Sequence, residues 1–135
     1  MSPDWHFNEL LRVARSQPEQ QRLLFVFASA ELPEDATPEQ RRNFRSGNGG
    51  ALAPRMCVDK AATELQGFAA LAEEARQVGP PWSVMFAASL GGEDGRAPDS
   101  ARIDLALETM VQAIREGRIA GYAAYGPTGA PLQIS

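Results

Sequence analysis

"RLLFVFASAEL" (residues 22–32) is the stretch of sequence that decides the fold class of this chain. It is a continuous apolar run with two phenylalanines, and it is too short and too uniformly apolar for a helix on a protein surface. A β-strand covered on both faces fits this pattern best. The stretch therefore predicts a sheet with a layer of helices packed on it.

Two helices are predicted on either side of this strand, over residues 4–16 and 37–46. The first has apolar residues at the i, i+3, i+4 and i+7 positions that share one helix face, namely Phe7, Leu10, Leu11 and Ala14. The second begins with a capping box, because Thr37 precedes Pro38 and Gln40 follows three residues after the threonine.

Two longer helices are predicted at about 62–77 and about 101–116, each with an apolar stripe and a glycine or proline stop signal. The capping candidates are Thr63 with Gln66, or Asp59 further upstream, for the first of them, and Asp99 or Ser100 for the second.

Further strands are predicted at 52–58 and 82–90, and the end of the chain, "RIAGYAAYGPTGAPLQIS", is predicted to form two strands joined by a Pro/Gly-rich turn. The fold class expected is therefore α/β (or α+β), a single domain over 1–135 with the order α-β-α-β-α-β-α-β-β. This alternation favours a largely parallel or mixed sheet of about five strands, with a C-terminal β-hairpin.

The composition narrows the classes of function. The net charge of −4 gives no global attraction to nucleic acid or to an anionic membrane, and no apolar run approaches the roughly 20 residues of a membrane helix. The N-terminal stretch carries acidic residues and lacks the apolar core of a signal peptide. A single cysteine cannot form an internal disulfide, so we expect a cytoplasmic location.

Metal and nucleophilic chemistry have little support in the sequence. With one His and one Cys, and without HExxH or CxxC, no metal site and no cofactor are expected. No serine lies in a G-x-S-x-G elbow. A dyad of Cys57 with His6 stays open as an alternative, although a partly exposed histidine at a helix end is the main interpretation of His6. No catalytic residue is assigned.

The glycines of "GNGG" (47–50) could suggest a phosphate loop, but they run from a helix into a strand. A phosphate loop runs from a strand into a helix N-terminus, whereas a helix C-terminus presents carbonyls and partial negative charge. We therefore interpret 47–50 as a helix stop and a turn. In the strand that follows, Arg55, Cys57 and Asp59 are expected to share one face, with Cys57 buried and inert.

Acidic residues follow each of the first three predicted strands. Glu31, with Glu34 and Asp35, follows the first, Asp59 the second, and Glu93 with Asp94 the third. If the three strands are parallel, these carboxylates converge on one edge of the sheet, where ligand sites of α/β folds lie. The alternative interpretation is that loops are simply hydrophilic.

Three arginines on the short helix form a basic patch. Arg41, Arg42 and Arg45 suit an anion or a protein partner, or alternatively the dipole at the helix C-terminus. The candidate ligand-binding residues of the whole chain are accordingly Glu31, Arg41, Arg45, Arg55, Cys57, Asp59 and Glu93.

Three segments, "PEQQRLLFVFASAELP", "GGALAPRMCVDK" and "WSVMFAASLGGEDGRAP", resemble a family of short, mostly proteobacterial proteins along nearly the whole chain. Members of that family often carry the label "ribonucleotide reductase subunit alpha". A reductase large subunit needs a long barrel, a radical-bearing cysteine and a redox-active cysteine pair, which 135 residues with one cysteine cannot supply. The resemblance implies kinship without a mechanism, and we expect that this chain is not a ribonucleotide reductase.

These observations favour a small non-enzymatic protein-interaction or regulatory domain that acts through a protein partner or as a homodimer. The alternative is a small-ligand-binding or enzymatic domain that uses the acidic residues at the strand ends. A thiol sensor at Cys57 is a third hypothesis.

Overall fold

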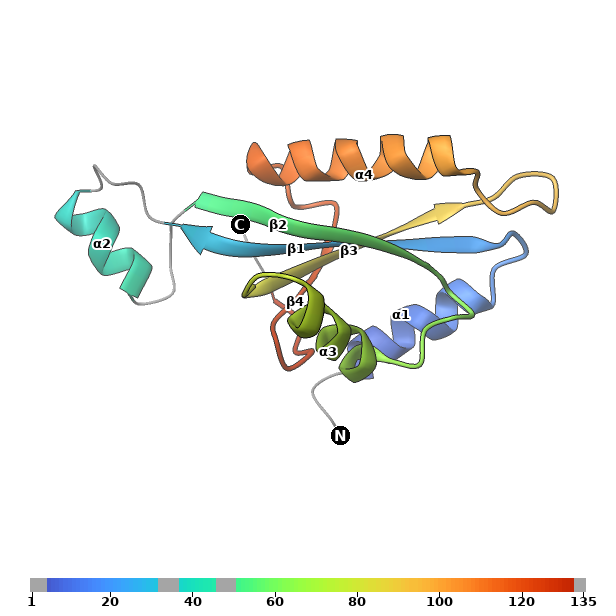
Figure 1. Ribbon diagram of the computed structural model, residues 1–135, viewed down its shortest axis with the longest axis horizontal. Helices are drawn as coiled ribbons and strands as arrows, with labels where there is room; N and C mark the ends of the chain where they lie inside the picture. The colour runs from blue at the N-terminus through green and yellow to red at the C-terminus, as the bar shows by residue number, and fades with distance from the viewer. Residues whose placement is uncertain (1–4, 32–36, 46–50, 133–135) are drawn as a thin grey trace.

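Strand β1 (Gln21–Glu31) is a central strand of a four-stranded antiparallel sheet with the order β2-β1-β3-β4. The computed structural model describes residues 5–31, 37–45 and 51–132. The other elements are α1 (Trp5–Arg15), α2 (Pro38–Arg45), β2 (Ala51–Ala61), α3 (Phe68–Val78), β3 (Val84–Gly91), α4 (Ser100–Arg115) and β4 (Ala123–Tyr125). Figure 1 shows the sheet with α4 on one face and with α1 and α3 on the other.

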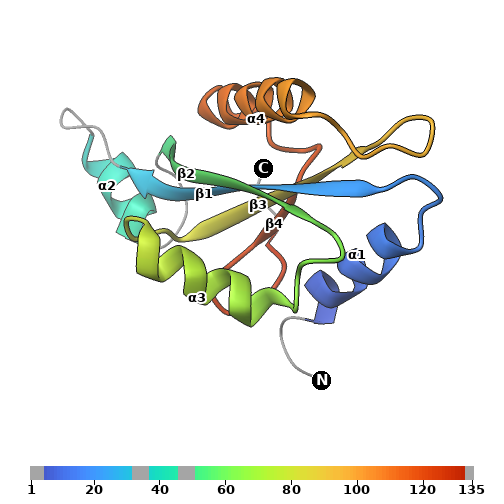
Figure 2. The same ribbon diagram turned by 45° about the vertical axis from the view of Figure 1, so that its right-hand side comes forward.

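The alternation of side chains along β1 divides the apolar core into two halves. Leu23, Phe25 and Phe27 are fully buried among residues of α1 and α3. The intervening residues, Leu24 and Val26, are buried against α4. Both faces of β1 are therefore covered, as its uniform apolar sequence predicts, and Figure 2 shows the sheet between the two helix layers.

The prediction of a largely parallel or mixed sheet is wrong, and the difference changes where the candidate site residues lie. Strand β1 is antiparallel to both β2 and β3, and β3 is antiparallel to β4. The chain reverses direction between β1 and β2, so β2 returns beside β1, and α3 then connects β2 to β3 on the far side of β1. Alternation of helices and strands alone does not distinguish this arrangement from a parallel sheet.

The C-terminal hairpin is reduced to one strand and a bridge. β4 pairs with β3, and Tyr125 at the end of β4 also forms an isolated bridge with Pro131. Proline has no N–H to donate to a ladder, and the last residues of the second predicted strand, 133–135, lie outside the described residues. Within the described residues the sheet has four strands and the order of elements is α-β-α-β-α-β-α-β, rather than the five strands expected.

Two of the predicted helix starts are confirmed. The Thr37 N–H donates to Gln40 Oε1 (2.8 Å) and the Gln40 N–H donates to Thr37 Oγ1 (3.1 Å), which is a complete capping box. Asp99 caps α4, because its carboxylate accepts a hydrogen bond from the Arg102 N–H at 2.8 Å. Between the two candidates for that cap, the structure selects Asp99.

The capping box predicted for the third helix is wrong. Helix α3 begins at Phe68, after Gly67, which has a φ of 143° that other residues rarely adopt. The residues before it, 62–67, form a turn and no helix. Leu65 of this turn is still buried in the core with α3, which explains why the apolar spacing starts before the helix does.

Candidate functional site

Strand β2 lies at an edge of the sheet, with β1 on one side only. Cys57 pairs with Val26 and Asp59 pairs with Leu24, and both of these β1 residues belong to the half of the core under α4. Met56 and Val58 pack on the other half, with α1 and α3. The predicted common face of Cys57 and Asp59 is therefore confirmed.

Arg55 does not share that face. The register of β2 against β1 shifts between Phe27 and Ala28, which makes Arg55 the extra residue of a β-bulge. Its Nε donates to Ser29 Oγ at 2.8 Å. Ser29 follows Ala28, which packs under α4, so alternation places the Ser29 side chain on the opposite face of the sheet. The bulge thus separates Arg55 from Cys57.

Cys57 is exposed, which contradicts the prediction that it is buried and inert. It lies in a groove of about 460 Å³ between β2 and α4, here called the β2–α4 groove. The helix residues that line this groove are Asp104, Leu107, Glu108, Val111, Gln112 and Arg115. The sequence could not reveal the exposure of Cys57, because it depends on β2 being an edge strand that α4 leaves partly uncovered.

Alternate residues of β2 direct their backbone N–H and C=O groups toward the open edge of the sheet. The Ala62 N–H donates to the Gln21 carbonyl at 3.1 Å, which fixes the phase of the antiparallel ladder. In that phase Cys57, Asp59 and Ala61 direct their N–H and C=O groups away from β1. The Ala61 N–H is already taken, because it donates to Glu64 Oε1 at 2.7 Å. Cys57 and Asp59 keep outward backbone groups on the edge.

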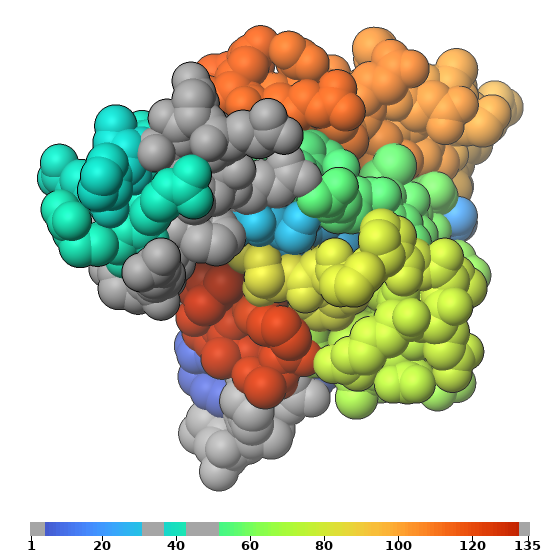
Figure 3. All heavy atoms as spheres, turned by 60° about the vertical axis from the view of Figure 1, so that its left-hand side comes forward, coloured from blue at the N-terminus to red at the C-terminus, as the bar shows by residue number. Residues whose placement is uncertain are grey.

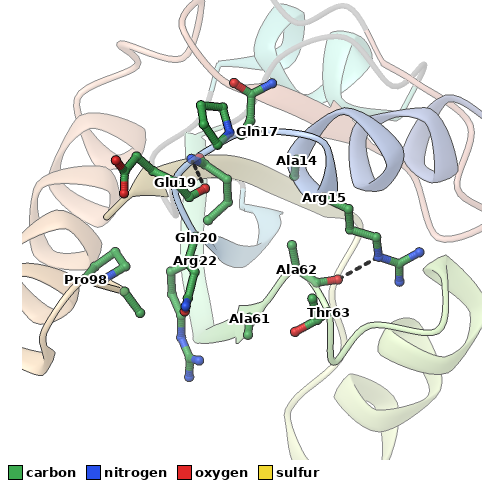
Figure 4. A pocket seen from close by; sticks show the side chains of 13 residues that line it. Ala14, Arg15, Gln17, Glu19, Gln20, Arg22, Ala61, Ala62, Thr63 and Pro98 are labelled. Carbon is green, nitrogen blue, oxygen red and sulfur yellow. Dashed lines mark hydrogen bonds between the residues drawn. The ribbon is translucent and has the colours of Figure 1, made fainter. Parts of the chain in front are cut away.

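A second group of charged residues lies at the end of the sheet where β1 begins. Arg22 Nε donates to Asp59 Oδ2 at 2.7 Å, and its Nη1 lies 3.3 Å from Glu64 Oε1. Arg15 Nε donates to the Ala62 carbonyl at 3.0 Å, as Figure 4 shows. Arg15, Arg22 and Ala62 border a cleft of about 390 Å³ between the end of α1, the start of β1 and the turn after β2. The arginines of the cleft are therefore engaged with groups of the protein itself.

The candidate acids do not converge on one edge, because the sheet is antiparallel. Glu31 pairs with Ala51 at one end of the sheet, whereas Asp59 lies toward the other end, near the pair of Gln21 with Gly91. Glu93 lies beyond β3 at that second end, and its Oε1 is 3.9 Å from Arg102 Nη2. Glu34 and Asp35 fall outside the described residues. A site built from Glu31, Asp59 and Glu93 together is thus ruled out by the strand directions.

The basic residues of α2 are distant from Asp59 and Glu93. Figure 1 shows α2 beyond the end of β1 at which Glu31 lies. Arg41 and Arg42 are exposed, and Arg45 ends the helix. The glycines at 47–50 fall outside the described residues, so the interpretation of that stretch as a helix stop stays a prediction.

A dyad of Cys57 with His6 is not formed. His6 lies in α1, which covers one face of the sheet, whereas Cys57 lies on the face under α4. Among residues 5–31, 37–45 and 51–132, no group of three His, Cys, Asp or Glu side chains is arranged to hold a metal ion. None of the helices within these ranges has the length and apolar character to cross a membrane.

The α4 residues of the β2–α4 groove are not among the site residues predicted from the sequence. Asp104, Glu108 and Arg115 are exposed on the helix, next to the apolar Leu107 and Val111. The sequence shows that these residues lie along one side of the predicted helix, but a charged helix face is usually only solvated. Its position beside an open strand edge is what gives it a candidate role.

Comparison with protein-family models, with curated proteins and with solved structures finds no match to this chain. The family resemblance of the sequence therefore stays a prediction, and the candidate functions rest on the geometry alone.

Proposed function

We propose that this chain is a small protein-interaction domain that binds a protein partner, or a second copy of itself, through the edge of β2 and the β2–α4 groove. The observation that carries the proposal is that Cys57 and Asp59 turn their backbone groups outward beside an open groove. Edge strands with unpaired N–H and C=O groups are templates for pairing with another chain.

The residues on either side of Cys57 and Asp59 limit how the edge of β2 can pair with another strand. Pro54 lacks an N–H, Arg55 is bulged, and the Ala61 N–H is capped by Glu64. Each of these devices prevents a strand edge from pairing without specificity. They leave the segment around Cys57 and Asp59 open between them. In the same proposal the domain is cytoplasmic, which agrees with its single cysteine, and it is not a ribonucleotide reductase.

The cleft beside Arg22 supports the alternative, a small-ligand site, less well. Its two arginines already bond to Asp59, Glu64 and backbone carbonyls, so an anionic ligand has to displace existing partners. Displacement of charge-assisted bonds lowers the affinity that the cleft can offer.

Protection of the Cys57 thiol from alkylation tests the proposal. Cys57 is the only cysteine and lies in the groove, so its rate of reaction with a maleimide reports whether the groove is occupied. The dilute, tagged chain is mixed with lysate of cells that express it naturally, after the thiols of the lysate have been blocked. We expect the macromolecular fraction to slow alkylation, and the small-molecule filtrate to have no effect.

Protection by the filtrate alone would instead favour the small-ligand alternative. Unchanged rates with both fractions, together with an unchanged rate at increasing concentrations of the chain itself, would overturn the proposal. The unfolded chain serves as the reference for an unprotected thiol.

A further inference from the structure

We infer that the occupant of the β2 edge is a second copy of this chain, joined through antiparallel β2–β2 pairing about a two-fold axis at Val58. This inference rests on the proposed function, because it names the partner of the same surface. Three features of the described residues carry it. They are the outward-facing N–H and C=O groups of Cys57 and Asp59 on β2 (the backbone window), the side chain of Val58 between them, and the charges on α4.

The backbone window selects one register. In a two-fold antiparallel pair, residues whose groups point outward must face one another, so Cys57 and Asp59 are the groups available. An axis at Val58 places Cys57 of each copy opposite Asp59 of the other. Both residues then exchange N–H and C=O bonds with the opposite strand on each side of the axis. An axis at Cys57 would place Asp59 against the bulged Arg55, and an axis at Asp59 would place Cys57 against the capped Ala61.

The side chain at the axis suits this register. Val58 is partly exposed and packs against the core half of α1 and α3. In the two-fold pair it meets its own copy in the closer, non-hydrogen-bonded type of position, where β-branched side chains pack well. The exposed remainder of Val58 on each copy is thereby covered by the other.

The charges on α4 are complementary under the same symmetry. Figure 1 shows that α4 runs opposite to β2, so Asp104 lies toward the C-terminal end of β2 and Arg115 toward its N-terminal end. Cys57 is the β2 residue that lines the groove between these two positions. A two-fold axis beside Cys57 reverses the direction of the second helix. It therefore brings Asp104 of each copy toward Arg115 of the other.

Asp104 and Arg115 are too far apart to pair with each other within one chain. In the described part of the protein, neither Asp104 nor Arg115 forms an ion pair, and they are eleven positions apart along the helix, which is about three turns. Glu108 lies between them on the same side, and the same axis places it opposite Val111 of the second copy. Figure 3 shows β2 at the surface below α4, so this side of the molecule is open to a second copy.

A charge swap tests the inference directly. The full-length wild-type chain and the variants Asp104→Arg, Arg115→Asp and Asp104→Arg/Arg115→Asp are compared by sedimentation over a range of concentrations. We expect the wild-type chain to dimerise with increasing concentration. Each single variant should weaken the dimer about tenfold, because two attractive pairs become two like-charge pairs. The double variant should return to the wild-type dissociation constant, which an effect within one chain could not produce.

A disulfide tests the register without depending on charge. In the Cys57→Ser/Val58→Cys variant, the two introduced thiols lie at a non-hydrogen-bonded pair with Cα atoms about 4.5 Å apart. This separation lies within the range of roughly 4.4–6.8 Å that a disulfide spans. We expect this variant to form a covalent dimer under mild oxidation. The wild-type Cys57 should not, because it faces Asp59 of the second copy.

A wild-type chain that stays monomeric at all concentrations would overturn the inference, and so would single charge variants without effect. Failure of the double variant to restore the dimer, in a sample whose unfolding transition is unchanged, would also overturn it. If the chain is monomeric but the macromolecular lysate fraction still protects Cys57, the proposed function stands and the partner is a different protein.

Discussion

Arg22 of the central strand and Asp59 of the edge strand are joined by a hydrogen-bonded ion pair with an Nε–Oδ2 distance of 2.7 Å. Their side chains are about 30% exposed, so the pair is only partly screened by water. The pair fixes the end of β2 to β1 beside the open segment of the edge.

The contribution of this pair can be measured with a double-mutant cycle of Arg22→Met and Asp59→Asn. We expect each single change to lower the free energy of unfolding in urea by about 1 kcal/mol, with a favourable coupling between them. Arg118→Met is the control, because Arg118 pairs with Glu116 at the surface and should change stability much less. A coupling energy of zero for Arg22 and Asp59 would show that the pair adds no stability.

The turn after β3 depends on Gly92. Glu93 and Arg96 form a β-bridge around Asp94 and Gly95, both of which have positive φ. A Cβ atom at position 92 would lie 1.8 Å from the Arg96 carbonyl oxygen. We therefore expect Gly92→Ala to lower the free energy of unfolding by roughly 2–3 kcal/mol, because the backbone of the turn must shift.

The matched control for this turn is Gly121→Ala, since a Cβ atom at position 121 has no neighbour within 4 Å. Its stability should stay within about 0.5 kcal/mol of the wild-type value. Equal urea midpoints for the two alanine variants would contradict the tight contact at Gly92.

The cap of α4 predicts different losses of stability for substitutions at two neighbouring residues. Asp99→Ala should lower the free energy of unfolding by about 1 kcal/mol, because the Arg102 N–H loses its acceptor. Ser100→Ala, at the other capping candidate, should have a smaller effect. Thermal unfolding followed by circular dichroism compares the two variants, and a larger loss at Ser100 would argue against the observed cap.

Tyr125 predicts a loss of stability at alkaline pH. Burial raises the pKa of the Tyr125 phenol above its ordinary value, because the charged phenolate is poorly solvated in the core. A raised pKa in the folded state means that this stability is present below the unfolded pKa of about 10 and is lost as the pH rises toward the folded pKa. Urea unfolding at increasing pH should therefore show a decline above about pH 10.

Tyr125→Phe removes the ionising group and should flatten this alkaline decline while leaving the stability at neutral pH nearly unchanged. A decline of the same size in Tyr125→Phe would assign it to other groups of the chain.

Much of the fold could be predicted from local patterns. The run at 22–32 predicts a strand covered on both faces, and the structure places it at the centre of the sheet between two helix layers. The capping box of Thr37 with Gln40 and the cap at Asp99 are also confirmed, because a cap depends on residues three positions apart in the chain. The start of α3 could not be predicted in the same way, since Leu65 of the preceding turn is buried like a helix residue.

The sequence by itself determined which segments are apolar on one face and which on two, because side-chain period and local hydrogen bonds are properties of neighbouring residues. Only the tertiary structure decided the strand directions, which separate Glu31 from Asp59, and the bulge, which separates Arg55 from Cys57. It also placed β2 at an edge, and this exposes Cys57 beside α4. These features depend on how segments that are distant in the sequence pair with one another. The residues within one strand do not determine which other strand pairs with its edge.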